Sequence, residues 1–260
     1  MGLGSFLSSC FSAACNAVGG LCSAIGGALS SACSMIGSMG AAIGSFVAGI
    51  SASLASCLGP VLALAASINP VTLICAVIIV GFLAKNMGVS DTSPEELGEI
   101  ALNHPEIKPE NFKSYSAYID ELKKHKDEFK REDFEKKPPM EQAAALAVGT
   151  GILVKGIEDK LQMEVPLDFI TTMIKGGVTP QMTENLLASM SEKGIKSAGV
   201  FTDYINGNKL SEAKTLKMDT VMAEFAANGG TTVNEILGNI DSGRGEQIYE
   251  AALKERNQNS

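Results

Sequence analysis

Residues 1–60 read MGLGSFLSSCFSAACNAVGGLCSAIGGALSSACSMIGSMGAAIGSFVAGISASLASCLGP, and residues 61–84 continue with VLALAASINPVTLICAVIIVGFLA. This stretch contains no Asp, Glu, Lys, Arg or His, whereas all 21 Lys and Arg, all 29 Asp and Glu and both His lie between Lys85 and Ser260. Apolar surface of this extent is unfavourable in water unless protein or lipid covers it. The composition therefore predicts an apolar helical region over residues 1–87 and a soluble, acidic helical domain over residues 88–260.

Bulky apolar residues recur at every seventh position of the uncharged region, and a second such row lies three to four residues away. This spacing places both rows on one side of a helix. A flexible Gly/Ser/Ala linker has no reason to repeat Leu, Ile and Phe in this way, so a helix is the better interpretation. The predicted apolar face consists of Cys22, Leu29, Ile36, Ile43 and Ile50.

Small residues also repeat every seven positions, on a different side of the same predicted helix. Such rows let two helix backbones approach closely, as in the glycine-zipper contacts of membrane helices. Glycine costs about 1 kcal/mol relative to alanine in a helix, so lipid or close packing must hold this segment. A stripe of hydroxyl side chains that includes Ser38 and Ser45 is the candidate surface for contact with water. The predicted helix-packing face consists of Gly20, Gly27, Ser34, Ala41 and Ala48.

Residues 61–84 form the most apolar part of the chain. A helix that spans a bilayer needs about 20 apolar residues, which this segment provides, and Pro70 is expected to kink the helix or to start it. Residues 6–29 and 36–58 could supply two further crossings, or a single long helix that lies in an interface or lines a pore. The predicted membrane-spanning core consists of Leu73, Ile74, Val77, Ile78, Ile79, Val80 and Phe82.

The charged region predicts helices and no strands, which makes the whole fold all-α. Its apolar spacing indicates one amphipathic helix over residues 112–129, ended by Pro138 and Pro139. Residues 142–154 carry no charge and are too few to span a bilayer, so they predict a buried central helix, with an insertable hairpin as the alternative. Thr232 and Glu235 have the spacing of a capping box. Cap signals bracket further helices over residues 166–175, 180–193, 197–206, 211–227 and 245–256.

No catalytic, cofactor-binding or metal site is expected. His104 and His125 lack the spacing to Cys or carboxylates that a metal site or catalytic pair usually shows. The six cysteines form no C-x-x-C pair and are read as small apolar helix residues in a reducing setting. The net charge of −8 argues against a nucleic-acid partner. The N-terminus lacks the basic residues of a secretory signal peptide. We therefore expect a protein that is not an enzyme.

Three classes of function fit this pattern. The first is a membrane-inserting, self-associating protein, such as a pore-forming toxin or secreted effector. Its partners would be the lipid bilayer and further copies of itself (a homo-oligomer), together with a chaperone, an immunity protein or a secretion machine. The second class is a structural or delivery component, such as an internal virion protein or injection channel. The third is a membrane anchor with a cytosolic, partner-binding domain.

The sequence favours insertion with self-association, because an anchor needs one span and this chain devotes about three spans of uncharged residues to the task. The expected location is the membrane, with a soluble or chaperone-bound state before insertion.

Overall fold

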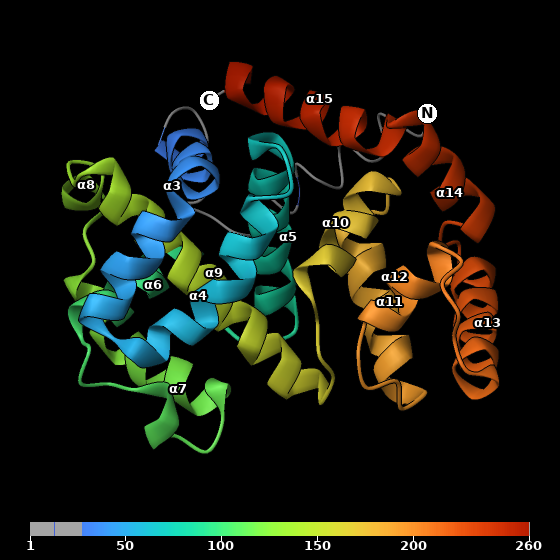
Figure 1. Cartoon of the computed structure of the whole chain (residues 1–260), viewed down its shortest axis with the longest axis horizontal. Coiled ribbons are helices and arrows are strands. Elements are labelled where there is room, and N and C mark those ends of the chain that lie inside the picture. Colours follow the sequence, from blue (N-terminus) through green and yellow to red (C-terminus); the bar gives the residue numbers. More distant parts are fainter. Residues whose placement is uncertain (1–12, 14–27, 260) are drawn as a thin grey trace. The chain divides into compact units, whose positions relative to one another are not determined.

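The computed structural model describes Ala13 and residues 28–259 (Figure 1). In this part of the chain all the regular elements are helices, namely α3–α15 and the 3₁₀ helices η1 and η2, with no strand. Helix makes up 77% of the structure, so the predicted all-α fold is confirmed. Gly20, Cys22 and Gly27, which the sequence assigned to helix faces, lie outside the described residues.

The chain forms two compact units. The first lies within Cys15–Lys160, and the second contains Leu161–Asn259. The change in composition at Met87 and Gly88 therefore lies inside the first unit rather than between the two units. The physical reason is that the charged region supplies helices that cover the apolar ones, so both share one core.

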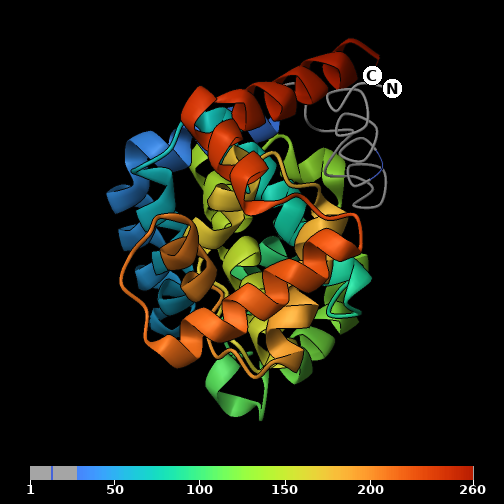
Figure 2. The same cartoon turned by 90° about the vertical axis from the view of Figure 1, so that its right-hand side faces the viewer.

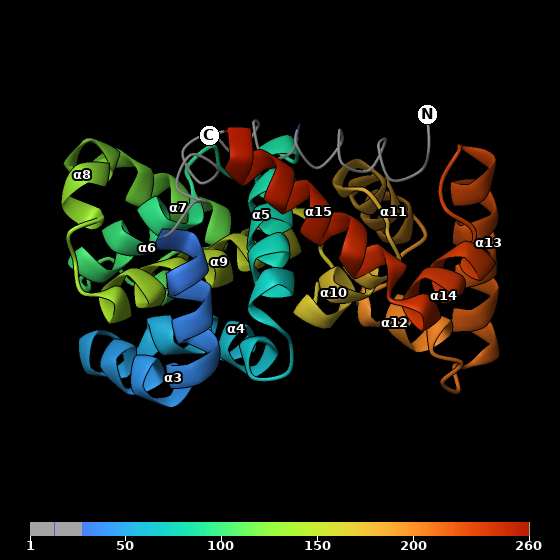
Figure 3. The same cartoon turned by 90° about the horizontal axis from the view of Figure 1, so that it is seen from above.

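The first unit contains seven α-helices among its described residues. α3 packs beside α4, and α5 also contacts this pair (Figure 3). Its elements are α3 (Ala28–Ile50), α4 (Ala52–Ala65), α5 (Pro70–Asn86), α6 (Pro94–Asn103), η1 (Pro109–Asn111), α7 (Tyr115–Leu122), η2 (Lys123–Glu128), α8 (Arg131–Phe134) and α9 (Pro139–Leu161).

Two polar caps divide the apolar region into separate helices. The Ser51 side chain accepts a hydrogen bond from the Leu54 amide at 3.5 Å and starts α4. The Asn69 side chain accepts one from the Thr72 amide at 2.8 Å, with Pro70 at the first turn of α5. Proline suits this position because its missing N–H would have no helical partner there. Residues 61–84 are therefore divided between α4 and α5, and Pro70 starts a helix rather than kinking one.

The uncharged parts of two helices form the centre of the first unit. Every residue of α5 from 72 to 84 is buried, and so is every residue of α9 from 142 to 154. A helix that is apolar all round belongs in a protein core or a bilayer, and here other helices cover it. The predicted buried central helix at residues 142–154 is confirmed.

Glycines allow α9 to touch two neighbouring helices through its backbone. A Cβ atom on Gly98 of α6 would lie 1.8 Å from the Ala145 carbonyl oxygen of α9. A Cβ atom on Gly151 of α9 would lie 2.1 Å from the Cys57 carbonyl oxygen of α4. Because real Cβ atoms do not approach so closely, only glycine permits these two helix crossings.

The expected single helix over residues 112–129 is wrong. This segment forms α7, which starts at the Ser114 cap, and then the 3₁₀ helix η2, after which Phe129 is extended. The run KKHKDE of η2 has no apolar side chain to bury, so no packing holds it in a regular α-helix. Pro139 begins α9 instead of only ending the segment before it.

The described residues 161–259 of the second unit form six α-helices (Figure 2). Their limits agree with the predicted ones to within three residues, because caps and glycines mark them clearly. The predicted capping box between Thr232 and Glu235 is confirmed. The rings of Phe169 and Phe201 meet edge to face in its core, 5.7 Å apart. The helices are α10 (Leu167–Lys175), α11 (Pro180–Glu192), α12 (Gly199–Ile205), α13 (Glu212–Ala227), α14 (Val233–Ser242) and α15 (Arg244–Asn259).

Candidate functional site

α3 is the helix of the described chain that is long and apolar enough to cross a membrane, over the 22 residues Leu29–Ile50. Only 22% of its most apolar window is buried. α4 and α5 are apolar but shorter. A long uncharged helix with this much free surface is unusual for a protein in water, where core helices are mostly covered.

The residues of the predicted apolar face that lie on α3 point into the first unit, whereas Met39 is 42% exposed. Leu29, Ile36 and Ile43 are buried, and Ile50 is half-buried. They are part of the predicted apolar face, and they belong to the side of α3 that packs on α4 and α5. Burial of such side chains stabilises the helix by about 1.5–3 kcal/mol for each one that is fully covered.

The small residues of the predicted helix-packing face lie on the other side. Ser34, Ala41 and Ala48 are all exposed, so no contact with residues that the structure describes buries this face. It remains open to solvent, lipid or another molecule.

A different row of small residues forms the contact between α3 and α4. A Cβ atom on Gly37 would lie 3.3 Å from the Ala65 carbonyl oxygen, and one on Gly44 would lie 3.3 Å from Leu62 Cδ1. The sequence analysis placed the packing face on another row of small residues and did not single out this one. The closer spacing of Gly37, Gly40 and Gly44 was the available signal.

The predicted membrane-spanning core lies inside the protein. Helices of the first unit bury all seven residues, so none is available to lipid in this conformation. They are Leu73, Ile74, Val77, Ile78, Ile79, Val80 and Phe82.

The two histidines meet at the surface of the first unit. In the 3₁₀ helix η2, three residues complete one turn, so His125 lies over Glu128 and its Nδ1 is 2.9 Å from Glu128 Oε1. His104, at the end of α6, places Nε2 3.0 Å from Glu128 Oε2. The two imidazole rings are 4.1 Å apart between centroids. Sequence reasoning treated each histidine as isolated, although the spacing of His125 and Glu128 was a visible signal.

Both ring nitrogens of His104 face carboxylates, because Nδ1 is also 3.0 Å from Glu106 Oε1. An ionised carboxylate only accepts, so both nitrogens donate when His104 is the imidazolium. Burial by itself lowers the pKa of His104, but the hydrogen bonds to Glu106 and Glu128 outweigh it, so this pKa is raised. Hydrogen bonds from His125 and His104 lower the pKa of Glu128.

Buried carboxylates of α6 tie the following segment to the first unit. Glu95 Oε1 accepts a hydrogen bond from Arg131 Nη2 at 2.7 Å, and Glu99 pairs with Lys137. Both carboxylates are buried, which makes these pairs part of the packing rather than solvated surface charges. They position α8 and the loop after η2 beside the histidines.

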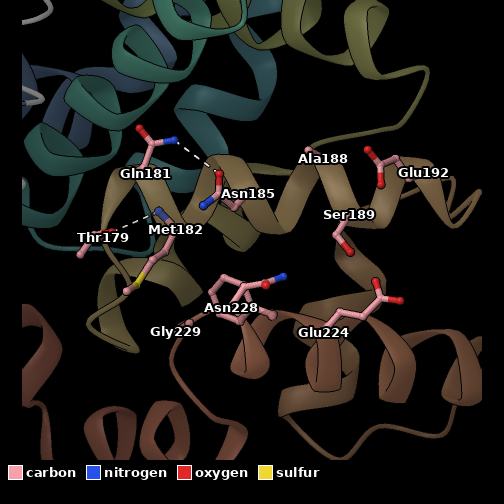
Figure 4. A pocket seen from close by; sticks show the side chains of 12 residues that line it. Thr179, Gln181, Met182, Asn185, Ala188, Ser189, Glu192, Glu224, Asn228 and Gly229 are labelled. Atoms are coloured by element: carbon pink, nitrogen blue, oxygen red, sulfur yellow. Dashed lines mark hydrogen bonds between the residues drawn. The ribbon is translucent and has the colours of Figure 1, made fainter.

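A separate groove of ≈ 570 Å³ lies between α11 and α13 in the second unit (Figure 4). Seven of its twelve lining residues carry hydroxyl, amide or acidic side chains, and none of the twelve is His, Cys, Lys or Arg. Gln181 and Asn185 line it from α11, opposite Asn228. At its rim, Lys193 Nζ donates to Glu224 Oε1 at 2.6 Å. Its chemistry suits hydrogen bonding to a polar ligand rather than catalysis.

Two features of the first unit therefore carry distinctive chemistry, namely the uncharged helix α3 with its open small face and the histidine cluster. No protein-family model, no curated protein and no solved structure matches this chain.

Proposed function

We propose that this protein inserts its uncharged N-terminal helices into a lipid bilayer and associates there with further copies of itself, as a pore-forming toxin or a secreted effector does. The observation that carries the proposal is α3, whose uncharged span Leu29–Ile50 has 22 residues, with 22% of its most apolar window buried. α3 is kinked at Met39, whose φ and ψ of −124° and 22° are not helical. Straightened into one helix at a rise of 1.5 Å per residue, its 22-residue span would be about 33 Å long, which matches a hydrocarbon core of about 30 Å.

The helices that follow α3 provide further apolar residues that could cross the bilayer. α5 is covered in the packed protein, and no charge interrupts the chain before Lys85. If α3 enters a bilayer, α4 and α5 lose part of their cover in the first unit, since both pack on α3. The end of α4 and α5 together provide 24 uncharged residues, 61–84, enough for a second crossing.

Self-association would use the outward side of α3. Ser34, Ala41 and Ala48 are exposed there, and their small side chains would let two helices approach closely. In lipid there is no hydrophobic drive between helices, so close backbone packing is a main source of their affinity. Before insertion, a chaperone, an immunity protein or a secretion machine would cover this surface.

A charge placed on the outward side of α3 tests insertion directly. Ala41 is exposed, so Ala41→Glu should change the stability of the packed protein by less than about 0.5 kcal/mol. In the middle of a bilayer the same charge costs about 2.5–3.5 kcal/mol. We expect Ala41→Glu to abolish dye release from liposomes and to make the protein extractable by alkaline carbonate.

The matched control is Ala213→Glu, which adds the same charge to an exposed alanine of α13. This variant should release dye as the parent does. Equal membrane association and leakage by the parent and by Ala41→Glu would show that α3 does not enter the bilayer, and the proposal would fall.

A further inference from the structure

We propose that His104, His125 and Glu128 form a binding site for a divalent transition metal ion, for which Zn²⁺ is the test ion. One ligand atom from each residue lies within 4.8 Å of the other two. The three side chains come from segments that are separate in the sequence, the end of α6 and the 3₁₀ helix η2. They converge on one point at the surface of the first unit.

The donor atoms select the class of ion. Two imidazole nitrogens and one carboxylate oxygen suit Zn²⁺, Co²⁺, Ni²⁺ and Cu²⁺, whereas Ca²⁺ and Mg²⁺ prefer oxygen ligands alone. Zinc bonds of about 2.0–2.1 Å at a tetrahedral angle place two ligand atoms about 3.3 Å apart. The ligand atoms, now within 4.8 Å of one another, must therefore move closer together. Small side-chain rotations are enough for this, since Glu128 is 62% exposed and both rings reach the surface.

Glu106 provides an independent indication. When His104 Nε2 faces the ion, its Nδ1 is 3.0 Å from Glu106 Oε1. Histidines that bind metals usually donate the other ring N–H to a carboxylate, which fixes the tautomer and raises the basicity of the ligand nitrogen. Glu106 is therefore in the place of an orienting partner and is not needed as a ligand.

Two of the three lysines of η2 pair with other carboxylates. Lys123 Nζ is 3.2 Å from Asp91 Oδ1, and Lys124 Nζ is 2.6 Å from Glu121 Oε2. Neither pairing uses Glu106 or Glu128, whose carboxylates both face the imidazoles. A cavity of ≈ 70 Å³ borders His104 and Glu128 and offers room for water to complete the coordination.

The ion would act as a cross-link within the first unit. It would join the end of α6 to η2, a segment that has no buried residue of its own. Ligands that bind only the folded state stabilise it by mass action, so zinc should raise the melting temperature of the first unit. This inference does not depend on membrane insertion, and liposome leakage does not test it.

The experiment uses the full chain without a polyhistidine tag, stripped with a chelator and titrated with ZnCl₂ by calorimetry. We expect one ion per chain. His104→Gln, His125→Gln and Glu128→Gln should each weaken binding at least 10-fold, and Glu106→Gln about 10-fold through the orienting contact. Glu132→Gln removes the same charge from a nearby exposed position and should bind zinc as the parent does.

Histidine imidazole resonances provide a second readout, since the chain has only two histidines. Both sets of signals should shift together at one equivalent of zinc. The absence of binding at 100 µM free Zn²⁺ would overturn the proposal. So would zinc affinity that persists in His104→Gln and His125→Gln with unshifted imidazole signals, because the ion would then be bound elsewhere, for instance by cysteine thiols.

Discussion

A Cβ atom on Gly149 of α9 would lie 1.7 Å from the carbonyl oxygen of Pro94, the first residue of α6. Gly98 makes the reciprocal approach to α9, so the two helices cross with their backbones in contact. This crossing holds a charged helix, α6, against the uncharged centre of α9. It is one reason why the first unit includes residues on both sides of the composition boundary.

Replacing Gly149 should separate these helices. We expect Gly149→Ala to destabilise the first unit by at least about 1–3 kcal/mol, because the new methyl group meets backbone atoms that cannot move aside. Thermal unfolding followed by circular dichroism measures the change. The control is Gly238→Ala in α14, where no atom lies within 4 Å of the added Cβ and stability should rise slightly. A parental melting curve for Gly149→Ala would contradict the close crossing.

The division of the chain predicts which fragment folds alone. We expect residues 161–260 to form a helical monomer, because α10–α15 share one compact unit. Residues 88–260 should aggregate or bind apolar dyes, because removing α4 uncovers α9 at Gly151 and deprives Tyr115 of its contact with Cys57, 3.3 Å away. Size-exclusion chromatography compares the two fragments. A well-behaved monomer of residues 88–260 would show that α4 and α5 are dispensable for the charged helices.

The capping box of α14 should make the second unit sensitive to acid. Glu235 accepts hydrogen bonds from the backbone amide and the hydroxyl of Thr232, both at 2.8 Å, and these lower its pKa from 4.5. A carboxyl whose folded pKa is lowered contributes stability that is present above pH 4.5 and is lost as the pH falls through the folded pKa.

Glu235→Gln should therefore lower the stability of the second unit by about 0.5 kcal/mol at pH 7, with the difference disappearing in acid. Thr232→Ala removes the cap itself and should cost about 1 kcal/mol. Urea titrations at several pH values measure both effects. A difference between parent and Glu235→Gln that stays constant down to pH 3 would rule out the charge as its cause.

Two neighbouring stripes on the exposed side of α3 should respond differently to added bulk. Ala41→Leu places a large side chain on the exposed face, so folding in water should be unaffected while cross-linked oligomers and liposome leakage decrease together. Ser38→Leu, on the stripe of hydroxyl side chains, should preserve oligomers and alter conductance. Gly27→Leu should act as Ala41→Leu does. Parental oligomers and leakage in Ala41→Leu and Gly27→Leu would favour a simple anchor.

Much of the secondary structure follows from local chemistry in the sequence. Thr232 and Glu235 form their capping box from neighbouring atoms, and Pro180 begins α11 because its ring suits a first helical turn. The uncharged segment at residues 142–154 could be assigned to a core for a similar reason, since it is apolar yet too short to cross a bilayer. The sequence pattern wrongly predicted an α-helix at η2, because this run has no apolar side chains whose packing would stabilise one.

The sequence by itself determined that residues 1–84 need cover, because they contain no charge, and that the chain is helical, because apolar periodicity and caps act over a few residues. Tertiary structure decided which of the described apolar helices are covered by other helices of the protein. α5 is enclosed by its neighbours, while α3 keeps its small face open. Tertiary structure alone also brought His104 to His125 and Glu128, because ligands on separate segments meet only when the chain between them folds back.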